Sequence, residues 1–488
     1  MEKNNQTTKG DIFDKKKLVV NHVDEIADER GKYINKNKYY YQDLIKFFTH
    51  NISEQSRVLE IGCGTGHILN AINPKNGVGI DVSEKMIAIA RKAYPQLSFY
   101  HMAAEEMDFD QEKFDYIIIS DTLGYFEDIQ KVFRQLKKVI TADTRIIITY
   151  HSFLWQPILK LAEYLKLKMP QKRLNWLNDK DIKNLLYLED FDVIKTGRRF
   201  LIPKKIFGLS YFINKYLAFL PLFNWFCLTG FIVARLKEND KPADDFLSVS
   251  VVIPTRNEKG NIEEAVKRIP LMGKETEIIF VEGDSTDGTL DEIKRVVDLY
   301  KNKSRGIVIK YVVQAGRGKG DAVRNGFSLA KGDVLMILDA DLTVPPEDLP
   351  KFYNAIAENK GEFINGSRLV YPLEDEAMMT LNMIGNTFFS LMFTWLLGQR
   401  FKDTLCGTKV ISKKNYGKLI ANRKYFGDFD PFGDFDLIFG AAKLNLKIVE
   451  MPIRYRARQY GQTNISRFRH GWLLIKMVFF AMRKIKFI

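Results

Sequence analysis

Apolar runs and amphipathic stretches follow one another in two long series along this chain. In the first series, apolar runs predict strands at 57–61, 77–80, 97–101, 114–120 and 144–150, and helical periodicity predicts helices at 66–73, 84–93 and 127–139. In the second series, strands are predicted at 249–253, 277–281, 307–313 and 333–338, with helices at 260–268, 288–299 and 319–330. Strands that alternate with helices are typical of parallel sheets covered by helices. The pattern therefore predicts an α/β fold twice over.

The stretch 237–247 is charged, contains a proline and lies between two apolar strands, so it predicts a linker between two domains. The expected layout is a mobile N-terminus at 1–20, a first domain at 21–236, a second domain at 248–470, and a basic amphipathic C-terminal helix at 471–488. Inside the first domain, Phe191–Leu201 and Phe231–Leu236 predict an antiparallel hairpin that closes the sheet around an apolar insertion at 204–226.

Two uncharged stretches, Tyr216–Ala234 and Ala377–Gly398, approach the length of a membrane span, which needs about 20 apolar residues. The first contains Pro221, and the second carries a polar residue at every fourth position, which makes a polar stripe on a helix. Both features favour buried or interfacial helices over spanning ones. The tail 471–488 mixes aromatic and basic residues, so it either rests on an anionic membrane surface or packs against the second domain.

Charge and cysteine content narrow the partners and the compartment. The 74 basic residues exceed the 60 acidic ones, and this surplus favours phosphate-rich partners such as nucleotides and anionic lipids. No zinc-finger, helix-turn-helix or RNA-binding-sheet signature is present, so no nucleic-acid partner is expected. Cys63, Cys227 and Cys406 are too widely spaced for a disulfide framework, and the polar start of the chain lacks a secretory core. We therefore expect a cytoplasmic protein, peripheral on the inner face of the cell membrane.

A glycine-rich turn in the first domain indicates a nucleoside ligand. Glu60-x-Gly62-x-Gly64-x-Gly66 lies between a predicted strand and a predicted helix, where glycines allow close approach and the helix N-terminus favours negative groups. The spacing differs from the Gly-x-Gly-x-x-Gly pattern of dinucleotide sites. Asp81 ends the following strand, where its carboxylate can accept hydrogen bonds from both ribose hydroxyls. The pattern disfavours NAD.

With these motifs in this order, residues 58–121 resemble the class I S-adenosylmethionine-dependent methyltransferases. The resemblance implies a Rossmann-like domain that uses S-adenosylmethionine as its cofactor. It implies a set of cofactor-binding residues: Glu60, Gly62, Gly64, Gly66, Asp81, Val82, Met86, Ala104, Glu105 and Ser120. In that set, Asp81 would hold the ribose, and Val82 and Met86 would flank the adenine.

No motif identifies the methyl acceptor. His151 follows the fifth predicted strand and is the candidate catalytic base of this domain, although a histidine in that position is often structural. The cluster Tyr39–Tyr41 either covers the cofactor or packs the N-terminal helix, and packing is the favoured alternative.

Carboxylates follow successive strands of the second domain. Glu258 comes after the first strand, Glu282 ends the second, and Asp339 and Asp341 follow the fourth. A nucleoside diphosphate needs a divalent cation to neutralise it, and Mg²⁺ or Mn²⁺ prefers carboxylate oxygens. The pair Asp339 and Asp341 is therefore the candidate metal site. The glycine-rich basic loop 314–321, which contains Lys319, suits the diphosphate.

These residues resemble the family 2 glycosyltransferases, and within them the dolichyl- or polyprenyl-phosphate sugar synthases, over about 249–470. The likeness is carried by the runs 339–347, 366–368 and 403–409. It implies a GT-A fold and an inverting, metal-dependent transfer from a nucleotide-sugar donor to a lipid-phosphate or glycan acceptor. The resemblance also implies that Pro254, Glu258 and Glu282 hold the base and ribose of the donor. It implies that Asp339 and Asp341 bind the metal and the diphosphate, with Asp341 as a catalytic residue. Arg368 and Arg458 would contact phosphates.

Three departures from that family pattern leave the donor base and the acceptor open. The second motif reads Glu282-Gly-Asp-Ser instead of Asp-Asp-Gly-Ser, and the late motif that begins at Arg458 lacks its lysine. The stretch 426–436 is unusually acidic, and within it Asp434 is a candidate general base for a hydroxyl acceptor, against metal support or loop capping.

The two series together predict a bifunctional transferase, in which both domains act on one glycan or glycolipid pathway. The alternative is a glycosyltransferase joined to an inactive domain that binds S-adenosylmethionine and serves as a regulator or scaffold.

Overall fold

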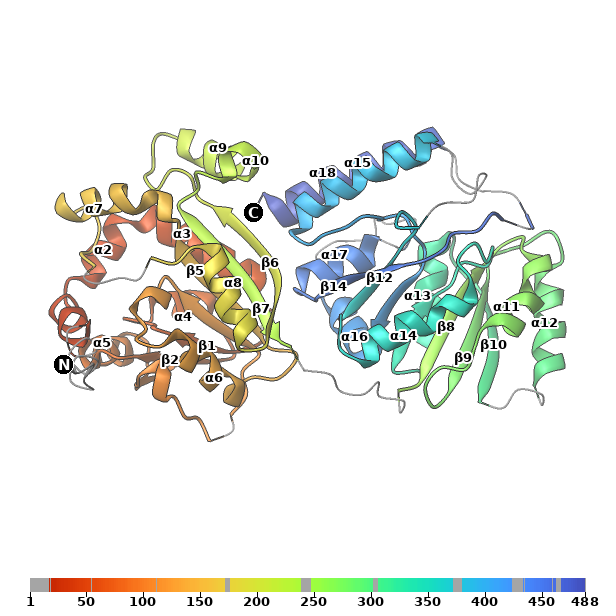
Figure 1. The fold of residues 1–488 in the computed structure, drawn as a ribbon, viewed down its shortest axis with the longest axis horizontal. Coiled ribbons are helices and arrows are strands. Elements are labelled where there is room, and N and C mark those ends of the chain that lie inside the picture. Colours follow the sequence, from red (N-terminus) through yellow and green to blue (C-terminus); the bar gives the residue numbers. More distant parts are fainter. Residues whose placement is uncertain are drawn as a thin grey trace, which may run out of the picture. The chain divides into compact units, whose positions relative to one another are not determined.

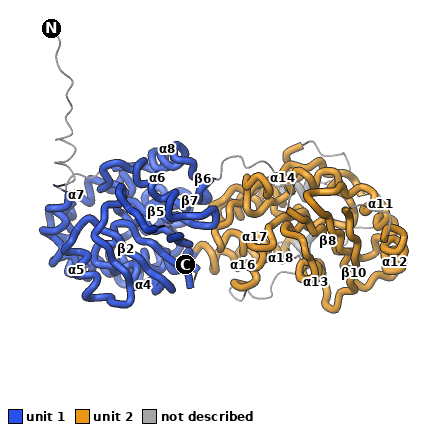
Figure 2. Tube along the Cα trace, turned by 90° about the horizontal axis from the view of Figure 1, so that it is seen from below, with its two compact units in different colours: residues 1–238, 487–488 blue, residues 239–486 orange. Residues whose placement is uncertain are grey.

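The computed structural model describes residues 17, 19–53, 55–110, 112–171, 176–237, 247–301, 306–371, 380–423, 433, 435–458, 460–461 and 467–487. The chain divides into two compact units, residues 1–238 with 487–488 and residues 239–486, as Figure 2 shows. Each unit has a sheet and an apolar core of its own. Residues 19–25 are helical, so the expected mobile N-terminus at 1–20 is too long. Val19, Val20 and Val23 of this helix line a cavity, which explains why it is held in place.

Unit 1 is built on a seven-stranded sheet with the order β3-β2-β1-β4-β5-β7-β6 (Figure 1). Its strands are β1 Arg57–Ile61, β2 Asn76–Asp81, β3 Ser98–His101, β4 Tyr116–Ser120, β5 Arg145–His151, β6 Phe191–Arg199 and β7 Thr229–Leu236. Neighbouring strands pair in parallel except at β7, which is antiparallel to both β5 and β6. The predicted α/β fold and the closing antiparallel hairpin are confirmed.

Helices cover both faces of this sheet. They are α2 Arg30–Lys36, α3 Lys38–Asn51, α4 His67–Ile72, α5 Glu84–Ala93, α6 Ile129–Val139, α7 Gln156–Tyr164, α8 Asp179–Leu188, α9 Leu209–Lys215 and α10 Pro221–Asn224, with 3₁₀ turns η1 Ala104–Glu106, η2 Leu123–Tyr125, η3 Phe153–Trp155 and η4 Leu217–Phe219. Side-chain caps explain several starts: Ser83 accepts from the Met86 amide at α5, and Asp128 accepts from the Lys131 amide at α6.

The core of unit 1 lies on both faces of the sheet. Within β4, Ile117 and Ile119 belong to one apolar cluster and Ile118 belongs to the other. Successive side chains of a strand point to opposite faces, so a strand covered on both sides has to be apolar throughout. This is why the central strands appear in the sequence as unbroken apolar runs.

Unit 2 is built on a second seven-stranded sheet with the order β10-β9-β8-β11-β13-β12-β14 (Figure 1). Its strands are β8 Val249–Thr255, β9 Thr276–Glu282, β10 Ile307–Val313, β11 Val334–Ile337, β12 Phe363–Ser367, β13 Lys409–Ser412 and β14 Ile448–Pro452. Strands β8 to β11 pair in parallel, whereas β13 is antiparallel to β11 and β12, so the sheet is mixed.

The helices of unit 2 are α11 Ile262–Arg268, α12 Thr289–Tyr300, α13 Lys319–Leu329, α14 Leu349–Ala357, α15 Thr380–Leu397, α16 Lys413–Ala421, α17 Phe435–Lys443 and α18 Arg467–Ala481, with short turns η5 Lys259–Asn261, η6 Pro346–Asp348 and η8 Met482–Lys486. Helix α18 lies beside α15 (Figure 1). Leu474 and Met477 of α18 are buried in the core, while Trp472 and Phe479 are exposed. One face of the tail thus packs against unit 2, as one of the two alternatives predicted. Among the described residues, no helix combines the length and apolarity needed to cross a bilayer.

Candidate functional sites

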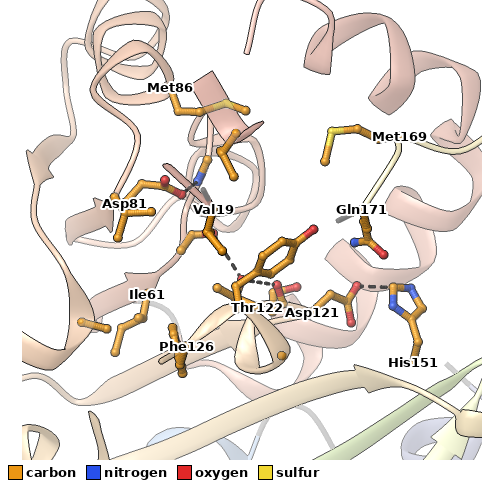
Figure 3. Close-up of a pocket in the computed structure, with 18 of the residues that line it drawn as sticks. Val19, Ile61, Asp81, Met86, Asp121, Thr122, Phe126, His151, Met169 and Gln171 are labelled. Carbon is orange, nitrogen blue, oxygen red and sulfur yellow. Dashed lines mark hydrogen bonds and ion pairs between the residues drawn. The ribbon is translucent and has the colours of Figure 1, made fainter. Parts of the chain in front are cut away.

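A cavity of about 1190 Å³ opens at the carboxyl edge of the sheet in unit 1. Strands β1, β2, β4 and β5 are parallel, so the residues at their ends meet at this edge. Most of the expected cofactor-binding residues line the cavity: Gly62, Gly64, Asp81, Val82, Met86, Ala104, Glu105 and Ser120. Figure 3 shows Asp81 and Met86 on one side of it and Asp121 and His151 on another.

Asp81 is held at one end of the cavity by the backbone around it. Its Oδ2 accepts from the Gly64 amide at 2.8 Å, and its Oδ1 accepts from the Ser83 amide at 3.0 Å. Gly64 has a φ of 53° and Gly62 a φ of 72°, and a side chain at Gly62 would collide with Thr122. The glycines are therefore required by both backbone conformation and space.

Arg30 lies over the glycine turn, and no sequence motif had indicated it. A Cβ at Gly64 would lie 2.7 Å from Arg30 Nε, and this buried nitrogen has no hydrogen-bond partner among the described residues. A buried guanidinium without a full set of partners is suited to a carboxylate ligand. S-adenosylmethionine fits this arrangement, since its ribose hydroxyls match Asp81 and its methionine carboxylate matches Arg30.

Two expected cofactor residues, Glu60 and Gly66, do not line the cavity and instead support the turn from beneath. Glu60 is buried, and its Oε2 accepts from the Leu69 amide at 3.1 Å inside α4. Burial raises the pKa of Glu60 to about 8, against the opposing charge of Arg30. Gly66 begins α4 with a φ of 75° and lies against the Phe99 ring. Both residues thus support the turn, and their direct contact with a cofactor stays a prediction.

The other end of the cavity holds a hydrogen-bonded group centred on Asp121. Tyr40 donates to Asp121 Oδ2 at 2.5 Å, and Thr149 donates to Asp121 Oδ1 at 3.1 Å. His151 Nε2 lies 3.8 Å from Asp121 Oδ2 and points toward it (Figure 3). Burial lowers the pKa of His151, and the Asp121 charge only partly offsets this effect, which favours the neutral imidazole. Of the tyrosine cluster, Tyr40 and Tyr41 line the cavity, and Tyr39 packs on Phe200.

The candidate site of unit 2 also lies at a carboxyl edge, where parallel strands β8, β9 and β11 end. Glu282 at the end of β9 is buried and accepts from the Ser285 amide at 2.7 Å. Glu258 accepts from Asn261 at 2.7 Å, and burial raises the pKa of Glu258 despite the nearby Arg458. Pro254 is the residue before the end of β8. The expected donor-site residues therefore come together at this edge.

Cations pair with both aspartates of the candidate metal site. Lys319 Nζ lies 2.6 Å from Asp339 Oδ1, and Arg458 Nη2 donates to Asp341 Oδ2 at 2.6 Å. Burial raises the pKa of Asp339, but Lys319 outweighs it and leaves the pKa below its ordinary value. Lys319 begins α13 directly after the glycine-rich loop, where Gln314 donates to the Gly318 carbonyl at 2.9 Å.

Within the part of the chain that the structure describes, no cluster of three or more His, Cys, Asp or Glu side chains is placed to hold a metal ion, so a cation at Asp339 and Asp341 stays a prediction. Mg²⁺ is commonly held by one or two carboxylates together with substrate phosphates, and Asp339 and Asp341 supply such oxygens. Gly407 lies so close to Asp339 and Lys319 that a Cβ there would collide with both side chains, so this position requires glycine.

Arg368 has a protein partner where a phosphate contact was expected. Its Nε and Nη2 donate to Asp403 at 2.7 and 2.9 Å, and Asn386 donates to the same carboxylate at 2.9 Å. Burial opposes ionisation of Asp403, but Arg368 outweighs it and lowers the pKa of Asp403 to about 2. This buried pair joins β12 to the 403–409 run, and its contact with phosphate stays a prediction. Asp434 lies outside the described residues.

Two family models match the chain: "Methyltransferase domain" over residues 52–194 and "Glycosyl transferase family 2" over residues 250–426. The chain is 40% identical over 126 residues to a dolichol-phosphate mannosyltransferase of Pyrococcus furiosus, covering 25% of this chain and 34% of that protein. It is 31% identical over 181 residues to an uncharacterized protein of Methanocaldococcus jannaschii, covering 36% and 84%. The chain thus spans about a third of the length of the first relative.

Among solved structures, one similar chain is an S-adenosylmethionine-dependent methyltransferase of Thermotoga maritima, described as a possible histamine N-methyltransferase. Its sequence identity is 17% and its TM-score is 0.35, over 45% of this chain and 100% of that one.

Proposed function

This chain belongs to glycosyl transferase family 2 through residues 250–426 and carries a methyltransferase domain at 52–194, and from that premise we propose a bifunctional enzyme of one glycan pathway. The C-terminal domain transfers a sugar, with inversion and a divalent cation, from a nucleotide donor to a polyprenyl-phosphate or glycan acceptor. The N-terminal domain transfers a methyl group from S-adenosylmethionine to a product of the same pathway. The observation that carries the proposal is the pairing of Asp339 and Asp341 with Lys319 and Arg458 at one sheet edge.

The charges around Asp341 support a donor diphosphate. The cations Lys319 and Arg458 supply positive charge where phosphates would lie, and the two aspartates supply oxygens for a divalent cation that neutralises the leaving group. Glu258 and Glu282 lie at the same edge and offer acceptors to ribose and base. The Pyrococcus relative is named for mannosyl transfer to dolichol phosphate, which supports a lipid-phosphate acceptor.

The group around Asp121 supports methyl transfer to a hydroxyl. A neutral His151 could take the proton of an acceptor hydroxyl, and S-adenosylmethionine, which Asp81 and Arg30 would hold, would supply the methyl group. Asp121 orients His151 and stabilises its positive charge, and Tyr40 and Thr149 hold Asp121 in place.

Turnover of nucleotide-sugars tests the proposal. Purified protein with Mg²⁺ or Mn²⁺ is assayed against a panel of UDP- and GDP-sugars, with and without a polyprenyl phosphate, beside Asp341→Asn. We expect one donor to be consumed much faster with the lipid and not at all by the variant. If the nucleotide-sugar is consumed equally fast with and without the lipid, the acceptor is a hydroxyl group instead. Consumption of the nucleotide-sugar without any metal would contradict the metal site. S-adenosylmethionine with a labelled methyl group is then added to the product, and incorporation of the label measures methyl transfer. Binding of S-adenosylmethionine without methyl transfer would favour a regulatory domain.

A further inference from the structure

Two segments of unit 1 leave the sheet at the edge where the cavity opens. The chain leaves β5 after His151 and leaves β6 after Arg199, and both residues pair with Thr229 at the start of β7. The segments 152–171 and 200–228 therefore begin or end at the same edge, and they hold α7, α9 and α10. These helices lie along one side of unit 1 in Figure 1.

Hydrogen bonds join the two segments into one continuous surface. Trp155 Nε1 donates to the Phe226 carbonyl at 2.8 Å. Lys36 donates to the Lys166 carbonyl at 2.7 Å, and Lys204 donates to Asn37 at 2.9 Å, so the junction between α2 and α3 contacts both segments.

This surface, here named the apolar rim, exposes many large apolar side chains. They are Phe153, Leu154, Leu161, Tyr164, Leu165, Phe207, Leu209, Tyr211, Phe212, Leu222, Trp225 and Phe226. Leu222 is 76% exposed and Trp225 is 70% exposed. Continuous apolar patches on a protein surface mark sites of contact with another apolar surface.

The charges of the apolar rim are positive apart from Glu163. Segment 200–228 contains no aspartate or glutamate, and it carries Lys204, Lys205 and Lys215. In 153–168 the one acidic residue is Glu163, which is paired with Lys168 at 2.7 Å. Exposed aromatic and aliphatic side chains combined with lysines are complementary to a bilayer that carries anionic headgroups.

The two segments that carry the apolar rim also contribute to the wall of the cavity. Trp155, Ile158, Leu159, Leu167 and Lys204 line the cavity and belong to the two segments, and Ile158 is also 52% exposed. Ile158 and His151 therefore line one cavity, and Ile158 also reaches the surface. The helices are too short to span, since α7 has nine residues and α9 has seven, so they would lie in the plane of the interface.

We propose that the apolar rim rests on an anionic bilayer and that the methyl acceptor, a lipid-linked glycan, enters the cavity from that surface. The choice of acceptor rests on the proposed function of the methyltransferase domain, whereas the contact with the bilayer does not.

A probe at Leu222 tests the contact directly. Cys63, Cys227 and Cys406 are buried, so Leu222→Cys in the full chain can be labelled selectively with an environment-sensitive fluorophore. The control is Tyr187→Cys, which is 74% exposed at the end of α8, next to the start of β6 and hence at the opposite edge. We expect a blue shift at position 222, and none at 187, on vesicles of phosphatidylcholine with phosphatidylglycerol. High salt should reduce the shift.

A triple variant, Leu161→Ser, Leu222→Ser and Trp225→Ser, tests the contribution of the apolar rim to binding. We expect vesicle partitioning to fall about tenfold or more, while S-adenosylmethionine binding is retained as proof of folding. Tyr187→Ser with Leu188→Ser is the matched control. Fluorescence at position 222 that does not shift on vesicles would overturn the proposal. So would a triple variant that partitions onto vesicles as the wild type does but no longer self-associates, because the surface would then bind a second copy of the chain. Vesicle partitioning is measured without methyl transfer. Failure of the proposed membrane contact can therefore be distinguished from failure of the proposed methyltransferase function.

Discussion

Arg458 donates to Asp341 at 2.6 Å and to Glu258 at 2.9 Å, so one guanidinium joins two carboxylates that follow different strands of the sheet. These contacts span 117 and 200 positions of sequence. Arg458 therefore contacts carboxylate oxygens that a divalent cation would also need, and a donor phosphate would compete with the same carboxylates for the guanidinium.

Replacing Arg458 by alanine should have opposite effects on two ligands. Removal of a charged hydrogen-bond donor should raise the KM for the nucleotide-sugar about tenfold or more. Removal of the cation from Asp341 should tighten Mn²⁺ binding in the absence of donor, which calorimetry would measure. An unchanged KM together with weaker Mn²⁺ binding would contradict this assignment.

Asp339→Asn should reduce sugar transfer by at least about 100-fold, because electrostatic stabilisation of the leaving group is lost. Binding of S-adenosylmethionine should not change, since that site lies in the other unit. Asp291→Asn, at an exposed position of α12, is the control for surface charge. Transfer by Asp339→Asn at the control's rate would exclude Asp339 from the metal site.

Asp81→Ala should weaken S-adenosylmethionine binding by about 10- to 100-fold, as expected for loss of hydrogen bonds to a charged group. Isothermal titration would measure it, with Asp108→Ala, an exposed aspartate of the same unit, as the control. Equal affinity in the two variants would remove Asp81 from the ribose site.

Methyl transfer should lose rate as pH falls through the pKa of His151, which burial holds below 6.5. Above that pKa the base is neutral and the rate should be flat. His151→Gln should cost about 10² to 10⁴ in rate. Asp121→Asn removes the charge that raises the pKa of His151, so the fall in methyl-transfer rate at acidic pH should move to lower pH. If neither the position of that fall nor the rate changes, Asp121 does not position His151.

Glu60 should make stability depend on pH. Its folded pKa of about 8 exceeds the ordinary value of 4.5, so between these values the unfolded chain is ionised while the folded chain holds the proton. Stability should therefore fall as pH rises through this window, by at most about 1.4 kcal/mol per pH unit, and level off above it. In Glu60→Gln the denaturation midpoint should vary less over the same window. Equal slopes in the two proteins would contradict the raised pKa.

The local pattern of apolar and polar residues was sufficient to predict the strands and helices of the fold. The strands β1, β8 and β11 and the helices α5 and α13 lie within a residue or two of their predicted bounds, because apolar periodicity and capping residues act over a few positions. The motif residues Gly62, Gly64 and Asp81 meet at one edge for a related reason. They end neighbouring parallel strands, and the carboxyl ends of parallel strands share an edge.

Residues without a motif could not be found in this way. Arg30 lies on a helix before the first strand, and Tyr40 reaches Asp121 across 81 positions. No spacing rule connects such pairs, because their proximity follows from how α2 and α3 pack over the sheet. The same holds for Arg368, whose charge suited a phosphate but whose guanidinium is paired with the buried Asp403.

The two α/β units, the glycine turn and the aspartates at the strand ends were predictable from the order of residues, because they depend only on periodicity and strand direction. Only the folded chain shows which cation contacts which carboxylate, that His151 lies beside Asp121, and that Ile158 and Leu159 of α7 line the cavity. Those relationships depend on contacts between distant segments, and packing of the whole chain selects them.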